Sequence, residues 1–168
     1  MHFKNIDIKR LLIKNVSHWP YLLYLLLSLL LISSREPWID EAWYTYPAVT
    51  LLREGVMLDV RWCNPERIHR FLLEPTSLVY ALWSKVGGIN IIWGRMLSII
   101  AGLLFLIVVN RCLCMIKVSA EIRRLTIGIS GINYFLLNAT SQIRPEALAL
   151  FALSLALRLC GPANEAAA

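Results

Sequence analysis

Two adjacent carboxylates, Asp40 and Glu41, are the side chains of this sequence best placed to do chemistry. They lie in the segment SSREPWIDEAWYTYPAVTLLREG (residues 33–55), among tryptophans and tyrosines and soon after a leucine-rich run. A carboxylate that aromatic side chains shield from water can act as a general base when a hydroxyl group reaches it. The position of this segment relative to a membrane therefore decides what the pair can do.

A purely structural role fits the same pair. Asp is a favoured helix N-cap, and Glu in a first turn complements the helix dipole. The helix that follows would bury an apolar stripe at three-to-four spacing, formed by Ala42, Tyr46, Val49 and Leu52, and Pro47 would kink it. Both roles are compatible, because a cap fixes the carboxylate and catalysis needs a fixed carboxylate.

The composition predicts an integral membrane protein. The chain is 58% hydrophobic and 17% charged, whereas a soluble domain is about half apolar and about a quarter charged. The apolar residues cluster, and together with their flanks they predict four membrane-spanning helices in an all-α fold. The predicted spans are residues 16–34, 91–115, 125–143 and 145–160, in one membrane module over residues 1–168.

The charge pattern orients these spans. Basic residues precede the first span and fill the loop from Arg111 to Arg124, which is typical of the cytoplasmic side, whereas acidic residues outnumber basic ones between Arg35 and Pro75. The net charge of +6 is thus explained by topology and not by nucleic-acid binding. A cleaved signal peptide is the alternative for the first span, but no A-x-A-like site follows it.

The loop from residue 35 to residue 90 is predicted to lie on the outer side, with one or two helices along the membrane surface. The stretch EPTSLVYALWSKVGG (residues 74–88) is apolar but short and contains Lys85. We expect it to lie in the interface, with its tryptophan and tyrosine at headgroup depth. A short spanning helix is the alternative, and it would place Arg111 to Arg124 outside.

The order of these features resembles the GT-C glycosyltransferases, in particular the protein O-mannosyltransferase and aminoarabinose-transferase branch. The residues that carry the resemblance cover positions 17–160: an apolar first span, WIDEAWYTYPAVTLLREG, LLEPTSLVYALWSKVGGIN, IIWGRMLSIIAGLL and SQIRPEALALFALSLAL. The chain departs from that branch in having no Lys directly after Glu74 and in having Arg144 where the branch places an Asp. It also has fewer spans, which is expected of an N-terminal portion.

The resemblance implies transfer of a sugar from a polyprenyl-phosphate donor to an acceptor hydroxyl, at the periplasmic or extracellular face of a bacterial inner membrane. It nominates Asp40 as the base and Glu41 as the residue that orients the acceptor. Cations near the outer face, Lys85, Arg95 and Arg144, would stabilise the leaving phosphate, with Glu146 beside them.

Each of these residues also has a structural alternative. Lys85 could snorkel, Arg95 could anchor its helix at headgroup level, and Arg144 could pair with Glu146 across a helix start. Glu74 would be the candidate ligand for a divalent metal, the one cofactor that the resemblance suggests, although one carboxylate makes a poor site. The acceptor is undefined: a glycan, a lipid or a protein. The alternative function is a non-catalytic or truncated membrane subunit that packs against partner helices through small residues such as Gly128 and Gly131.

Overall fold

The computed structural model describes residues 18–37, 39–55 and 75–160, and within these ranges the chain is entirely helical. The seven helices are α2 (Trp19–Ser34), α3 (Ile39–Glu54), α4 (Pro75–Gly87), α5 (Ile91–Met115), α6 (Ala120–Gly131), α7 (Tyr134–Thr140) and α8 (Pro145–Cys160). The prediction of an all-α fold is confirmed for the described residues.

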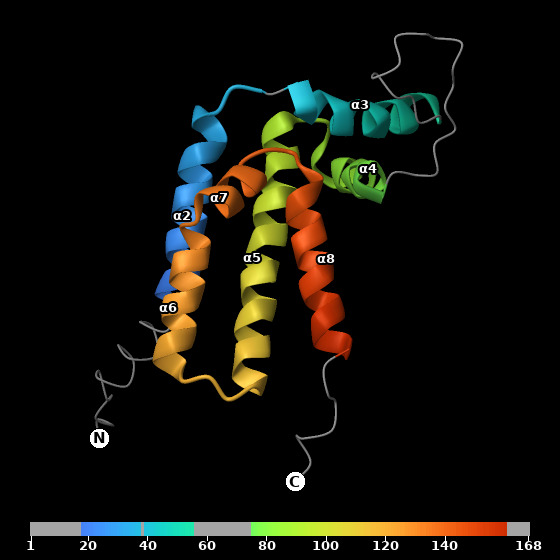
Figure 1. The fold of residues 1–168 in the computed structure, drawn as a ribbon. Helices are drawn as coiled ribbons and strands as arrows, with labels where there is room; N and C mark the ends of the chain where they lie inside the picture. Colours follow the sequence, from blue (N-terminus) through green and yellow to red (C-terminus); the bar gives the residue numbers. More distant parts are fainter. Residues whose placement is uncertain (1–17, 38, 56–74, 161–168) are drawn as a thin grey trace, which may run out of the picture.

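The helices form an upright bundle with a cap at one end (Figure 1). Helices α2, α5, α6 and α8 run lengthwise, whereas α3 and α4 lie across the end at which α2 finishes and α5 begins. The α5–α6 turn lies at the opposite end, and α7 leads from α6 back toward the cap. Helix α5 is central, because it contacts α2, α4, α6, α7 and α8.

One helix of the described part, α5, is long and apolar enough to cross a membrane, and α2 is apolar but shorter. The predicted third span differs most from the structure, because residues 125–143 do not form one helix. Asn133 interrupts them: its side-chain oxygen accepts a hydrogen bond from the Phe135 backbone N–H at 2.9 Å and so starts α7 as a new helix. Helix α6 begins earlier than expected, where Ser119 caps it.

Tyr24 is at the centre of the bundle core, where it is fully buried and donates its hydroxyl hydrogen bond to the Ile99 carbonyl at 3.0 Å. Two glycines make room for it. A Cβ at Gly102 would lie 2.2 Å from the Tyr24 hydroxyl, and one at Gly131 would lie 3.3 Å from the Tyr24 Cβ. Gly128 likewise faces Trp19 of α2, so these glycines allow close packing between helices of this chain.

The cap helix α3 buries only part of the stripe that was predicted for it. Ala42 and Tyr46 are exposed, whereas Val49 and Leu52 are partly buried and Leu52 packs toward α4 and Ile143. The inner face also carries Glu41 and Ala48. The buried carboxylate of Glu41 determines which face of α3 points inward, and a search for apolar residues alone cannot identify that face.

Two tryptophans join α4 to α5. The Trp83 indole N–H donates to the Trp93 carbonyl at 2.8 Å, and the Trp93 indole N–H donates to the Trp83 carbonyl at 3.1 Å. The two rings stack with centroids 4.7 Å apart. Gly87 lies against the Trp93 ring, and Gly88 makes the turn with a φ of +82°. This arrangement fixes the angle at which the cap meets the bundle.

Candidate functional site

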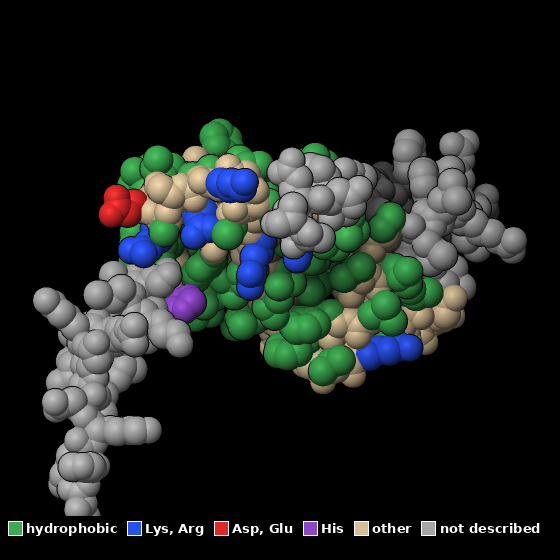
Figure 2. All heavy atoms as spheres, turned by 90° about the horizontal axis from the view of Figure 1, so that it is seen from below, with side chains coloured by type: hydrophobic (Ala, Val, Ile, Leu, Met, Phe, Trp, Pro, Cys, Tyr) green, Lys and Arg blue, Asp and Glu red, His purple; other side chains and the backbone are tan. Residues whose placement is uncertain are grey.

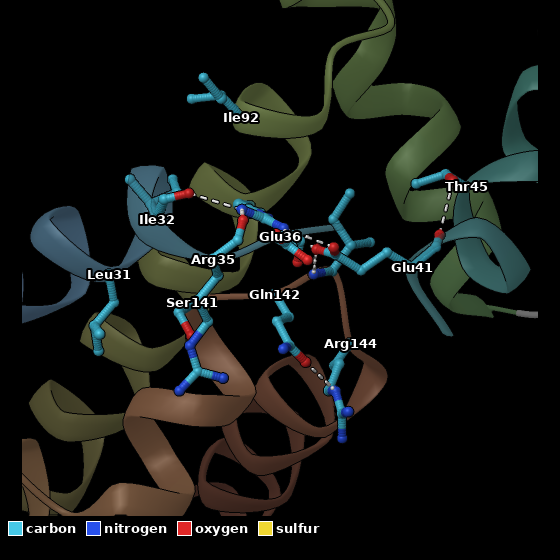
Figure 3. Close-up of polar contacts among 12 residues, drawn as sticks. Leu31, Ile32, Arg35, Glu36, Glu41, Thr45, Ile92, Ser141, Gln142 and Arg144 are labelled. Atoms are coloured by element: carbon cyan, nitrogen blue, oxygen red, sulfur yellow. Dashed lines mark hydrogen bonds and ion pairs between the residues drawn. The ribbon is translucent and has the colours of Figure 1, made fainter. Parts of the chain in front are cut away.

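Glu41 and Arg95 form a buried ion pair where the cap meets the bundle, and each residue is only 2% exposed. Figure 3 shows Glu41 with Ile32, Arg35 and Glu36 nearby. The Arg95 Nε donates to Glu41 Oε1 at 2.9 Å, and its Nη2 donates to Oε2 at 2.7 Å, which is a two-point contact between planar groups. A buried charge is tolerated only when it is paired and hydrogen-bonded, and this pair satisfies both conditions.

The rest of the Arg95 guanidinium binds the end of α2. Its Nη1 donates to the carbonyls of Ile32 at 2.7 Å and Arg35 at 2.9 Å, and its Nη2 donates to the Glu36 carbonyl at 3.3 Å. Together with the two bonds to Glu41, these contacts engage all five N–H groups of the guanidinium. Arg95 therefore satisfies carbonyls that α2 leaves unpaired at its C-terminal end.

Glu41 extends the same network to the turn before α8. Its Oε1 also accepts a hydrogen bond from the Ile143 backbone N–H at 2.8 Å. The pair thus ties four segments together: the end of α2, the first turn of α3, the start of α5 and the α7–α8 turn. Arg95 and Glu41 were predicted to bind phosphate and to orient the acceptor, and in this structure both side chains are engaged by protein groups.

Asp40 lies in the first turn of α3, directly before Glu41. Helix α3 begins at Ile39, so Asp40 is inside the helix and is not its N-cap, contrary to the cap prediction. Its side chain is outside the described residues, as is Glu74. The backbone at Asp40 is nonetheless held by its neighbour, because Glu41 is fixed by Arg95 and Ile143.

The remaining predicted cations lie on different elements. Lys85 is exposed in the last turn of α4. Arg144 is in the α7–α8 turn, where its Nε donates to the Gln142 side-chain oxygen at 2.7 Å and its Nη1 lies 3.8 Å from Glu146 Oε1. The pairing of Arg144 with Glu146 across the start of α8 is confirmed.

Arg35 is a site residue that the sequence analysis overlooked. It directly follows α2, and its Nη1 hydrogen-bonds the Asn138 side-chain oxygen of α7. Its carbonyl also accepts from Arg95. The sequence held a signal for it, since an arginine immediately after an apolar span lies at headgroup depth by the same reasoning that selected Arg95.

A cavity of about 230 Å³ lies beside Glu41, between α3, α4 and the start of α5. Its walls are mostly apolar, and its polar groups include Thr45, Tyr80, Ser84 and Asn90. The Tyr80 hydroxyl lies 2.7 Å from Ser98 Oγ, and burial raises the pKa of Tyr80 above its ordinary value. Tyr80 therefore stays a neutral hydrogen-bonding group.

A larger apolar groove, of about 560 Å³, lies between α4, α5 and the start of α8. Aliphatic and aromatic side chains line almost all of it, among them Val79, Leu97, Leu104, Leu148 and Phe151. Pro145 also lines it, so the groove reaches the turn that holds Arg144. Its chemistry suits a hydrocarbon chain.

The described part of the chain contains no group of three or more His, Cys, Asp or Glu side chains that could hold a metal ion. Comparison of the chain with protein-family models, with curated proteins and with solved structures gave no match. The functional interpretation therefore depends on the geometry and on the residues themselves.

Proposed function

We propose that this chain is the N-terminal membrane module of a glycosyltransferase that moves a sugar from a polyprenyl-phosphate donor to an acceptor hydroxyl at the non-cytoplasmic face. In this proposal the chain crosses the membrane four times, through α2, α5, the α6–α7 pair and α8. The cap of α3 and α4 lies on the outer membrane surface. The resemblance to GT-C glycosyltransferases supplies the reaction class.

Asp40 acts as the general base in this proposal. Its carboxylate accepts the proton of the acceptor hydroxyl while the acceptor oxygen forms a bond to the anomeric carbon of the sugar. The bond between that carbon and the phosphate oxygen breaks, and its electron pair leaves with the polyprenyl phosphate. Attack from the face opposite the leaving group inverts the anomeric configuration.

The observation that carries the proposal is the placement of the first turn of α3. The Glu41–Arg95 pair holds this turn against the ends of α2 and α5 through contacts of 2.7–2.9 Å. Catalysis requires a base that stays in position, and a network of buried charge-assisted hydrogen bonds provides that rigidity. A surface carboxylate on a loop would lack such support.

The apolar groove between α4, α5 and α8 supports a lipid-linked donor. Residues of α4, α5 and α8 line it, and Pro145 brings it next to the α7–α8 turn. An isoprenoid chain in this groove would bring its phosphate to the level of Arg144 and the cap. Arg144 is then the cation nearest the leaving phosphate, whereas Arg95 has a structural role.

Replacement of Asp40 by Asn tests the proposed base. Loss of a general base costs about 10²–10⁴-fold in rate, so transfer of radiolabelled sugar from a polyprenyl-phosphate donor to membrane acceptors should fall by that range. The matched control is Glu54→Gln, which removes an exposed carboxylate at the far end of the same helix. Equal transfer by wild type and Asp40→Asn, at equal membrane levels, would refute the assignment.

A further inference from the structure

The end of the bundle opposite the cap is strongly basic (Figure 2). Five cations lie there on three helices and one turn: Arg111, Lys117, Arg123, Arg124 and Arg158. Glu121, in the first turn of α6, is the acidic residue at this end of the described chain. None of the proposed catalytic residues lies here, so this surface is separate from the site at the cap.

The basic side chains lie on both sides of the α5–α6 turn: Arg111 is near the end of α5, and Arg123 and Arg124 are near the start of α6. The ion pairs found among the described residues are at the cap, and none involves a cation of this end. The Arg123 Nε is buried and has no hydrogen-bond partner in the described structure.

Exposed apolar side chains surround the same cations. Met115 and Ile116 end α5, Ile122 and Leu125 begin α6, and Leu157 and Leu159 end α8. Their exposed fractions run from 50% for Met115 to 75% for Leu159. A ligand for this surface therefore has to offer negative charge and hydrocarbon together.

We infer that this basic end binds the phosphate headgroups of anionic phospholipids, whose acyl chains cover the apolar side chains beside them. Basic residues at the end of a helix bundle attract anionic lipid headgroups. Nucleic acid would match the charge but would leave the apolar side chains in water. A phospholipid fits both kinds of side chain, because its phosphate can pair with the cations while its acyl chains cover the apolar side chains beside them.

This inference does not depend on transferase activity. It requires only that the bundle crosses a bilayer, and it concerns the cytoplasmic leaflet if the cap is outside. A transferase assay that fails would leave it standing, and a lipid-binding assay that fails would leave the proposed reaction at Asp40 standing.

Native mass spectrometry of the full chain released from nanodiscs tests the inference. The nanodiscs contain equal amounts of phosphatidylglycerol and phosphatidylcholine, and bound lipids are counted after release. Wild type should retain phosphatidylglycerol preferentially. Arg123→Gln with Arg124→Gln should lower that preference by about fivefold for each charge removed. The matched control, Arg53→Gln with Lys85→Gln, removes two exposed cations at the cap end and should leave it unchanged.

Three outcomes would overturn the inference. The first is equal retention of the two lipids by wild type, which needs no variant to interpret. The second is displacement of the retained lipid by inorganic phosphate alone, which would indicate a site for a free anion. The third is binding of a single-stranded oligonucleotide in detergent that competes with phosphatidylglycerol, which would indicate a nucleic-acid surface.

Discussion

A guanidinium whose five N–H groups all meet protein oxygens has no donor left for a phosphate, and Arg95 is in this state. Its partners are the Glu41 carboxylate and the carbonyls at the end of α2. The residue type suggested anion binding, and the geometry assigns a structural role. Glu41 follows the same pattern, because Arg95 and the Ile143 N–H engage it. Asp40, one position earlier, gains a fixed backbone from this network.

Substitutions of the pair distinguish a structural lock from a phosphate site. Glu41→Gln or Arg95→Gln leaves one buried charge without its partner, which costs about 3–5 kcal/mol of unfolding free energy. The double variant removes both charges and should recover part of that loss. Thermal unfolding in detergent, followed by circular dichroism, measures all three. Arg53→Gln, an exposed cation on α3, should change stability by less than about 0.5 kcal/mol.

The phosphate-site reading makes the opposite forecast for these variants. Under that reading, Arg95→Gln weakens donor binding without a large loss of stability, and adding Glu41→Gln brings no recovery. Such a result would indicate that Arg95 contacts the substrate.

At the scale of elements, the joint between the cap and the bundle is a pair of tryptophans. Trp83→Phe keeps a stacked ring but removes one indole N–H that bonds a main-chain carbonyl. A net loss of about 1 kcal/mol is expected for one such hydrogen bond, and Trp93→Phe should cost a similar amount. The stability loss of the double variant should differ from the sum of the two single losses, because the two hydrogen bonds join the same two residues. Differential scanning fluorimetry checks this, with Phe135→Leu at an exposed position as control. Additive losses would contradict a cooperative joint.

The groove between α4, α5 and α8 makes a separate prediction. Ala149 lines it and is exposed, so Ala149→Phe should fill part of the space without strain in the core. Crosslinking of a photoreactive polyprenyl phosphate should then decrease severalfold. Leu153→Phe adds a ring to the same helix outside this groove and should leave the crosslinking unchanged. Equal crosslinking by Ala149→Phe and wild type would place the isoprenoid chain elsewhere.

Elements with a strong local signal were predictable from the sequence. The boundaries of α5 follow from its apolar run and from Asn90, which caps it by accepting from the Ile92 N–H. Helix α4 likewise begins at Pro75 and ends before the glycine turn. The break between α6 and α7 was missed because Asn133 looks like a tolerable polar residue within an apolar stretch. Its capping role becomes visible only when the chain direction changes.

Two residues of the ion-pair network were selected from the sequence, but their roles were not predicted. Glu41 and Arg95 were selected by residue type and position, and the structure places them against each other, whereas Arg35 was missed. Glu41 and Arg95 are more than fifty positions apart in the sequence, so no local pattern predicts that they form an ion pair. The burial of Glu41 on the inner face of α3 was missed for the same reason, since its partner is a distant arginine.

At the scale of the whole molecule, the chain has two chemically different ends. The cap end holds the acidic doublet and its buried partner, and the other end holds five cations framed by exposed apolar side chains. Positive residues favour the cytoplasmic side of a membrane. This asymmetry orients the proposed bundle, and the proposed transfer at the non-cytoplasmic face requires that orientation.

Cysteine labelling with a membrane-impermeant maleimide tests this orientation most directly. The native cysteines (Cys63, Cys112, Cys114 and Cys160) are first replaced by serine, and single cysteines are then introduced as Glu54→Cys at the cap end and Lys117→Cys at the basic end. In intact cells the Glu54→Cys protein should be labelled, and the Lys117→Cys protein should react only after permeabilisation. Labelling of Lys117→Cys with protection of Glu54→Cys in intact cells would place the acidic doublet in the cytoplasm and contradict the proposed function.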